Sequence, residues 1–219
     1  MTRVLGTPEK VDRRDKLFSA AITALEERGW KVERIPGAGK SSVRRITKGG
    51  EKRIISIRTS QDRDIAFPRK KTDTGWATLD DVDYVVPSSV DDPDNPQFAL
   101  VHMIDAGEMR ERFDRAYAAR MKAGHSVPIG RGVWLSLYEN EASLPLRLVG
   151  AGAGIAHPPI AKVPLNGGNG AAMVVQVDEE RDPSASRQAE PPLSISEAKR
   201  RLALSLGVSE TDIKIIISS

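Results

Sequence analysis

The sequence predicts an α/β fold, in which a mixed sheet is flanked by helices, followed by a small C-terminal helix-strand module. Two periodic patterns carry this prediction. Apolar residues recur every three or four positions in two long segments, which is typical of amphipathic helices. Short alternating or apolar segments bounded by glycine and proline lie between and beyond them, which is typical of strands. A polar composition from Leu165 onward separates the core from the tail.

The first helix is expected to begin at Thr7 and Pro8 and to end at Gly29. Thr7 can cap it, and the missing N–H of Pro8 costs nothing at the first helical position. Strands are expected at 30–35, 43–47 and 53–59. The pair Gly49-Gly50 joins the last two as a hairpin, because glycine accepts the positive φ angles of a tight turn.

Residues 82–86 and 98–104 predict two further buried strands. Asp105 and Glu108 form a capping box for the second helix. One side of this helix is basic, so it is either solvated or a second contact to a phosphate backbone; its residues are Arg110, Arg112, Arg115, Arg120 and Lys122. A strand at 133–138 is expected to close the core and 150–159 to be irregular surface chain. The aromatic residues Phe67, Trp76 and Trp134 are expected in the core.

The predicted domains are an α/β core over 1–160, a flexible linker over 161–191 and a helix-strand module over 192–219. The linker contains DEERDPSASRQAEPP, which has almost no apolar residue. In the module, Ser194 and Glu197 can cap a helix, and 213–217 form an apolar strand that could pair with a second copy to give a homo-oligomer. The pattern of Ala203, Gly207 and Ile213 leaves a helix-turn-helix open as an alternative.

Composition narrows the classes of protein. The chain has 219 residues, of which 39% are hydrophobic, and no cysteine, so disulfides, thiolate metal sites and cysteine nucleophiles are excluded. The three histidines are scattered, and we expect no metal site. The first residues lack the apolar segment of a signal peptide, and no run is long enough to span a bilayer. We therefore expect a cytoplasmic protein with no membrane partner.

The charge is segregated along the chain rather than large in sum. Lys and Arg number 33 against 30 Asp and Glu, a net charge of +3, yet 28–58 is densely basic and 80–94 is acidic. A basic segment of this kind favours an anionic partner. The predicted nucleic-acid contacts are Lys40, Arg44, Arg45, Arg53, Arg58 and Arg63. Of these, Arg44, Arg45, Arg53 and Arg58 are expected to share one basic surface of the hairpin.

Two short motifs receive a structural interpretation. Residues 36–41, PGAGKS, resemble the second half of a Walker A loop, but Arg34 stands where that motif needs glycine, and no helix is expected to follow. We interpret them as a turn between strands. The run Asp91 to Pro96 is rich in oxygen ligands, but its prolines indicate a turn rather than a calcium site.

A longer resemblance covers about seventy residues. A helix ending in ERGW, a strand with Val32 and Arg34, a GAGK turn, a short strand, a glycine turn and then IISIRTS together resemble the core of the PD-(D/E)XK nuclease superfamily, notably Holliday-junction resolvases. The resemblance implies a restriction-endonuclease-like fold. It also implies two acids on one face of a hairpin that hold a divalent metal, and a neighbouring lysine.

The acids that the resemblance implies are absent. Ser56 and Arg58 occupy the (D/E)-X-K positions, and the other acid position falls at 42–44, which has no carboxylate. We therefore predict a non-catalytic nucleic-acid-binding protein, most simply a DNA-binding one, with no cofactor. One alternative is a Mg²⁺-dependent endonuclease with relocated acids, for which Asp62, Asp64 and Asp83 are candidates, together with Arg58 and Ser56. The other is an assembly module that uses the C-terminal strand.

Overall fold

The computed structural model describes residues 7–35, 42–127, 130–166 and 173–174. Their elements, in chain order, are α1 (Pro8–Glu27), β1 (Lys31–Arg34), β2 (Val43–Lys48), β3 (Glu51–Ser60), β4 (Asp64–Pro68), η1 (Leu79–Asp81), β5 (Tyr84–Val90), β6 (Phe98–Val101), β7 (Ile104–Asp105), α2 (Ala106–Lys122), β8 (Gly132–Ser136), η2 (Leu146–Leu148), α3 (Ala153–Ala156), β9 (Ala161–Pro164) and β10 (Met173–Val174). Contacts divide the chain into Met1–Val177 and Asp178–Ser219. The predicted module at 192–219, most of the predicted linker, the turn at 36–40 and Lys40 lie outside the described residues.

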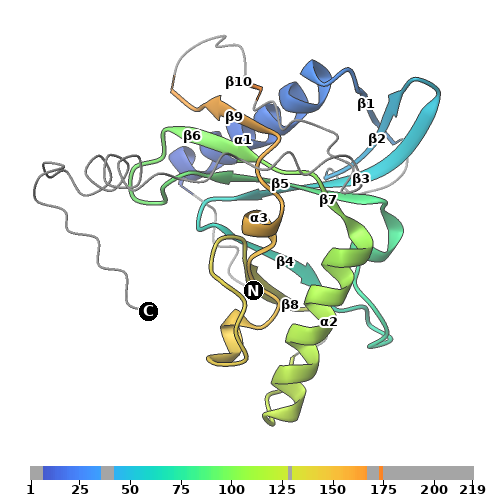
Figure 1. Ribbon diagram of the computed structural model, residues 1–219, viewed down its shortest axis with the longest axis vertical. Coiled ribbons are helices and arrows are strands. Elements are labelled where there is room, and N and C mark those ends of the chain that lie inside the picture. Colours follow the sequence, from blue (N-terminus) through green and yellow to red (C-terminus); the bar gives the residue numbers. More distant parts are fainter. Residues whose placement is uncertain (1–6, 36–41, 128–129, 167–172, 175–219) are drawn as a thin grey trace, which may run out of the picture. The chain divides into compact units, whose positions relative to one another are not determined.

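A mixed sheet of eight strands forms the centre of the described fold, in the order β1-β2-β3-β5-β6-β9-β10, with β7 paired to β5. Strands β1, β2 and β3 run antiparallel, and β5 is parallel to β3. Strand β6 pairs antiparallel with β5, and β9 pairs antiparallel with β6. The sheet curls, and α1 and α2 flank it (Figure 1). The predicted mixed sheet flanked by helices is confirmed at this level of detail. None of the described helices is both long and apolar enough to cross a membrane.

Local signals explain α1 and the β2-β3 hairpin. The side chain of Thr7 accepts a hydrogen bond from the backbone of Lys10, and Pro8 opens the helix, as predicted. Gly49 and Gly50 have φ angles of 56° and 87°, which the tight turn between β2 and β3 requires. The register pairs Lys48 with Glu51 next to this turn.

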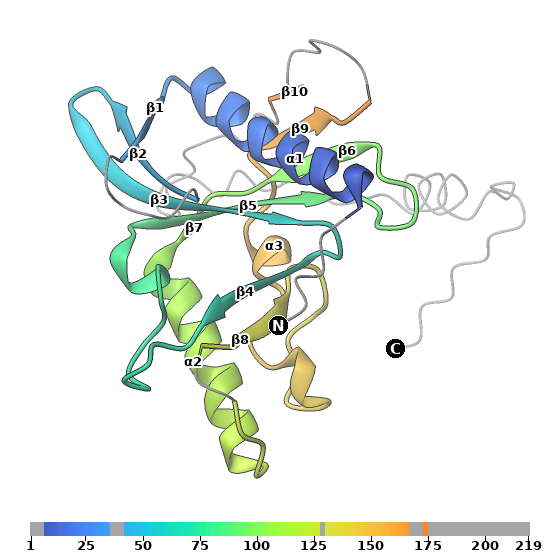
Figure 2. The same ribbon diagram turned by 180° about the vertical axis from the view of Figure 1, so that it is seen from behind.

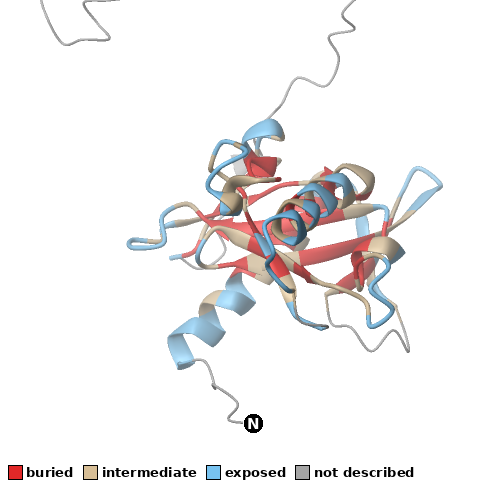
Figure 3. Ribbon diagram, turned by 90° about the horizontal axis from the view of Figure 1, so that it is seen from below, coloured by how far each residue is buried: buried red, intermediate tan, exposed pale blue. Residues whose placement is uncertain are grey.

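The main sheet has a different core on each face. On the face that we call the α1 face, Ile46, Ile55 and Ile57 pack against Leu17 and Leu25 of the first helix. On the opposite, α2 face, residues of β2, β5 and β7 pack with Phe67, Met109 and Phe113 among others. Figure 2 shows α1 covering one side of the sheet and β4, β8 and α2 lying on the other. Figure 3 shows the buried strands between these layers.

The strand predicted to close the core belongs to a second sheet. β8 pairs antiparallel with β4, with Phe67 opposite Val133, and these two strands form a separate two-stranded sheet. No strand was predicted between 59 and 82, whereas Asp64 begins β4. Phe67 and Trp76 are buried as expected, but Trp134 is 58% exposed, so its assignment to the core is wrong.

The folded core continues past residue 160, where the predicted linker began. β9 pairs with β6 in the main sheet, with Ala161 opposite Val101 and only 1% exposed. The preceding segment at 150–159 was predicted as surface chain, yet Ala151 and Ala153 are buried and α3 forms there. Small residues allow this segment to pack closely, a pattern that sequence alone does not distinguish from a loop.

Candidate functional site

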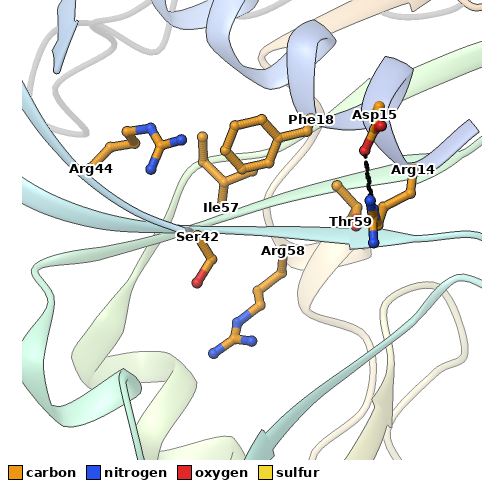
Figure 4. Close-up of a pocket in the computed structure, with 8 residues that line it drawn as sticks. All are labelled: Arg14, Asp15, Phe18, Ser42, Arg44, Ile57, Arg58 and Thr59. Atoms are coloured by element: carbon orange, nitrogen blue, oxygen red, sulfur yellow. Dashed lines mark hydrogen bonds and ion pairs between the residues drawn. The ribbon is translucent and has the colours of Figure 1, made fainter. Parts of the chain in front are cut away.

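The arginines predicted to share one basic surface lie on opposite faces of the main sheet. In the register of the hairpin, Arg44 is opposite Ile55 and Arg45 is opposite Ile54. Successive side chains of a strand point to opposite faces, so Arg44 and Arg53 lie on the α1 face and Arg45 and Arg58 on the α2 face. Figure 4 shows Arg44 and Arg58 on opposite sides of β3. The prediction of a single surface is therefore wrong.

A cleft of about 420 Å³ lies between α1 and the part of β3 that extends past the start of β2. The first β2-β3 pair is Val43 with Ser56, and the amide of Ile57 still donates to the carbonyl of Ser42. Beyond that point β3 has no β2 partner among the described residues. The cleft at this edge is lined by Arg14, Asp15, Phe18, Ser42, Arg44, Ile57, Arg58 and Thr59 (Figure 4).

On the α1 face, two arginines border the cleft beside an aromatic ring. The guanidinium carbon of Arg44 lies 4.9 Å from the centre of the Phe18 ring, and its Nη1 donates to the carbonyl of Val43 at 2.8 Å. Burial, together with the charge of Arg34, lowers the pKa of Arg44. Arg14 pairs with Asp15 at 3.0 Å, and both side chains are exposed. The arginines outnumber the single acid of the lining, so the cleft is electropositive.

On the α2 face, Arg58 extends beneath β3. Its guanidinium carbon lies 4.1 Å from the centre of the Phe67 ring, and its Nε is buried without a hydrogen-bond partner. Burial lowers the pKa of this guanidinium from its usual range to about 10. Ser56 is 0% exposed, and its hydroxyl also lacks a partner. The (D/E)-X-K positions therefore hold a buried hydroxyl and a partly buried cation.

The candidate relocated acids serve local structure. Asp62 accepts hydrogen bonds from the Ser60 hydroxyl at 2.9 Å and from the Asp64 amide at 3.3 Å. Burial and the neighbouring charge of Asp62 raise the pKa of Asp64. Asp83 accepts from the amide of Ile54 at 2.6 Å. Within the residues that the structure describes, no group of three or more His, Asp or Glu side chains could hold a metal ion.

Most basic residues of α2 are tied to the protein itself. Arg112 pairs with Glu108 at 2.9 Å and donates to the carbonyl of Ala151 at 2.6 Å. Arg115 pairs with Glu141 at 3.0 Å. Arg110 and Arg120 donate to backbone carbonyls. These arginines therefore make contacts within the protein. From the sequence, only a solvated face or a phosphate contact was expected for them.

The β1-β3 hairpin region carries basic side chains that lack such partners. Lys31 pairs with Glu33 at 2.7 Å and Arg53 with Glu51 at 2.8 Å, which accounts for both acids of this region. Four further basic residues are exposed and form no ion pair with any described residue: Arg34, Arg45, Lys48 and Lys52. Arg45, Lys48 and Lys52 lie on β2 and β3, which also border the cleft, and Arg34 lies on the neighbouring β1.

A polar chain inside the α2 face was not predicted. Ser89 Oγ lies 2.7 Å from Tyr138 Oη, which lies 2.7 Å from Nε2 of His102, and Nδ1 of His102 lies 2.7 Å from the carbonyl oxygen of His157. A carbonyl can only accept, so Nδ1 carries the hydrogen, Nε2 accepts from Tyr138, and Tyr138 accepts from Ser89. His102 is 0% exposed, and burial lowers its pKa. Polar residues within the apolar strands at 84–90 and 98–102 were the signal that could have indicated it.

Arg63, another predicted contact, also packs against this chain. Its guanidinium carbon lies 4.2 Å from the centre of the Tyr138 ring, and its Nε is buried without a partner. It does not line the cleft. The structure thus brings Arg44 and Arg58 to one cleft, from opposite faces, and leaves Arg45, Arg53 and Arg63 outside it.

Comparison with family models, with curated proteins and with solved structures finds no match to this chain.

Proposed function

We propose that this protein binds nucleic acid without cleaving it. The observation that carries the proposal is the electropositive cleft, where Arg14 and Arg44 lie beside Phe18. Phosphates neutralise such arginines and release condensed counterions, which favours binding. The exposed Arg34, which is opposite Arg44 in the strand register, extends the same charge beyond the cleft. A phosphate backbone could follow this path from Arg14 towards Arg34.

The absence of cleavage follows from the residues at the nuclease-like positions. A helix followed by three antiparallel strands supports the resemblance to a PD-(D/E)XK scaffold. On that scaffold Val43, Ser56 and Arg58 would occupy the metal-binding face, and none is a carboxylate. A hard cation such as Mg²⁺ prefers carboxylate oxygens, and a neighbouring guanidinium repels it. We therefore assign the scaffold a binding role that needs no metal.

The test is a fluorescence-anisotropy titration of labelled DNA and RNA with the full chain. Replacing Arg34 and Arg45 by Gln removes two exposed charges with little effect on the fold, and Arg14→Gln removes one from the cleft. We expect affinity to fall by about five- to tenfold per lost phosphate contact. Arg131→Gln is the matched control, because Arg131 is exposed and lies just before β8. Equal affinities for all these variants and the unchanged chain would refute the proposal.

Cleavage is tested with the same substrates. Incubation of linear, supercoiled and branched DNA with Mg²⁺ or Mn²⁺ should leave them intact. Cleavage that disappears in Asp62→Asn or Asp64→Asn would show instead that relocated acids form an active nuclease. A contaminating nuclease would be unaffected by these substitutions.

A further inference from the structure

Arg58 is a partly buried cation without an anionic neighbour among the described residues. Its Nε is buried and makes no hydrogen bond, and no carboxylate among the described residues pairs with it. The Phe67 ring at 4.1 Å covers the guanidinium but accepts no hydrogen bond in its plane. A buried Nε without an acceptor is unfavourable, and the rest of the guanidinium is only partly exposed. The surroundings of Arg58 therefore favour the approach of an anion.

The cleft gives such an anion a way in. Arg58 and Ser42 both line it, and their side chains point to the same side of β3 (Figure 4). The Ser56 hydroxyl belongs to the same strand face, two residues before Arg58, and is 0% exposed without a partner. The inner part of the cleft therefore offers the guanidinium of Arg58 and the hydroxyl of Ser42, with no acid on this side of β3 among the residues that line it.

We propose that Arg58 and Ser42, at the inner end of the cleft, bind one phosphate group. A guanidinium can donate two parallel hydrogen bonds to phosphate oxygens, and a serine hydroxyl can donate a third. The hydrogen bonds from Arg58 would come from its outer nitrogens, because its Nε is buried. The phosphate has two possible sources, namely free phosphate and the terminal phosphate of a nucleic-acid strand.

A strand end fits the location better than an internal phosphodiester. An internal phosphate is attached to sugars on both sides, whereas a terminal phosphate is attached on one side and can enter a cleft end-on. Arg14 and Arg44 would then contact the following phosphates on the α1 face. This choice of source rests on the proposed function, but the phosphate site itself does not.

Thermal unfolding in inorganic phosphate, at constant ionic strength, tests the site. A ligand that binds only the folded state raises the melting temperature. We expect phosphate to stabilise the unchanged chain, to stabilise the exposed control Arg131→Met equally, and to leave Arg58→Met unaffected. Without phosphate, Arg58→Met should be as stable as the unchanged chain or more so, because the uncompensated charge is gone.

Two further variants keep the test valid if Arg58→Met fails to fold. Arg58→Lys retains the charge but loses the paired hydrogen bonds, and Ser42→Ala removes one hydroxyl, so each should weaken phosphate binding by about fivefold or more. Absence of any phosphate effect on the unchanged chain would overturn the site. The site would also be overturned if Arg58→Lys and Ser42→Ala bind phosphate as well as the unchanged chain does.

Oligonucleotides that differ only in a terminal phosphate identify the source. The phosphorylated strand should bind about tenfold more tightly than its hydroxyl counterpart to the unchanged chain, and equally to Arg58→Met. Equal binding to the unchanged chain would overturn the strand-end assignment. If neither oligonucleotide binds while inorganic phosphate stabilises the protein, the proposed function fails and the phosphate site stands.

Discussion

At the scale of single residues, burial decides what each polar side chain does. His102 is fully buried, yet both ring nitrogens have partners, and its hydrogen-bonded chain joins β5, β6 and the segments at 138 and 157. Arg58, by contrast, lies beneath the sheet with a buried Nε that has none. The first arrangement stabilises the fold, whereas the second leaves a buried donor unsatisfied, which costs stability.

Tyr138→Phe tests the first arrangement. The substitution removes the hydroxyl that donates to His102 and accepts from Ser89, and it leaves both groups buried without a partner. We expect the free energy of unfolding to fall by about 1–3 kcal/mol, measured by denaturant titration. The same change on α2, Tyr117→Phe, removes hydrogen bonds to the exposed Asp73 and should cost less. Equal losses would contradict the role of the buried chain.

The lowered pKa of His102 predicts a dependence of stability on pH. Below about pH 6.5 the unfolded chain binds a proton at His102, which the folded protein resists because the ring is buried. Stability should therefore fall as the pH drops from about 6.5 towards the folded pKa. His102→Gln should flatten this part of the profile, and His125→Gln, at an exposed position, should not. If the pH dependence of stability is unchanged in His102→Gln, then His102 is not its cause.

At the scale of elements, close approach of backbone fixes α2 against the segment that follows η2. Gly150 has a φ angle of 81°, and a Cβ there would lie 2.3 Å from the carbonyl oxygen of Arg112. Arg112 also donates to Ala151, so the contact and the hydrogen bond lie together. The tight fit explains why 150–154 is buried although its composition suggested a loop.

Gly150→Ala should therefore destabilise the protein by more than the strain of a positive φ angle alone. That strain is about 1 kcal/mol, and the clash with backbone adds to it. Gly124→Ala is the matched control, because Gly124 has a φ angle of 79° but a Cβ there would meet no atom within 4 Å. In denaturant unfolding, the free energy of unfolding of Gly150→Ala should be well below that of Gly124→Ala. Equal stabilities would mean that the close approach is not rigid.

Local signals predicted the helices and the hairpin, and non-local pairing limited the rest. Thr7-Pro8, Gly49-Gly50 and Asp105 with Glu108 each specify structure within a few residues, and each element forms where expected. The partner of a strand is not encoded in its own pattern, so the pairing of β8 with β4 could not be predicted. The same limit applied to the arginines. Alternation along a strand predicts the face on which each arginine lies, but it does not predict that the second sheet covers Arg58.

At the scale of the whole molecule, the basic segment predicted from the sequence contributes arginines to a cleft rather than to one face of the sheet. The basic residues do not form one face, but Arg14 of α1, Arg44 of β2 and Arg58 of β3 line one cleft. Self-association through residues 192–219 stays a prediction, since these residues lie outside the described part of the chain. Light scattering of the full chain and of a chain ending at Pro191 tests it. The idea fails if both have the same number of subunits.

The central claim is that phosphates bind the arginines around the cleft. Its most direct test is the affinity of the unchanged chain for labelled DNA and RNA as salt is raised from about 50 to 200 mM. We predict that log K falls linearly with log salt, and that Arg14→Gln reduces the slope by about one phosphate contact. No binding at the lowest salt, or an affinity that does not change with salt, would contradict it.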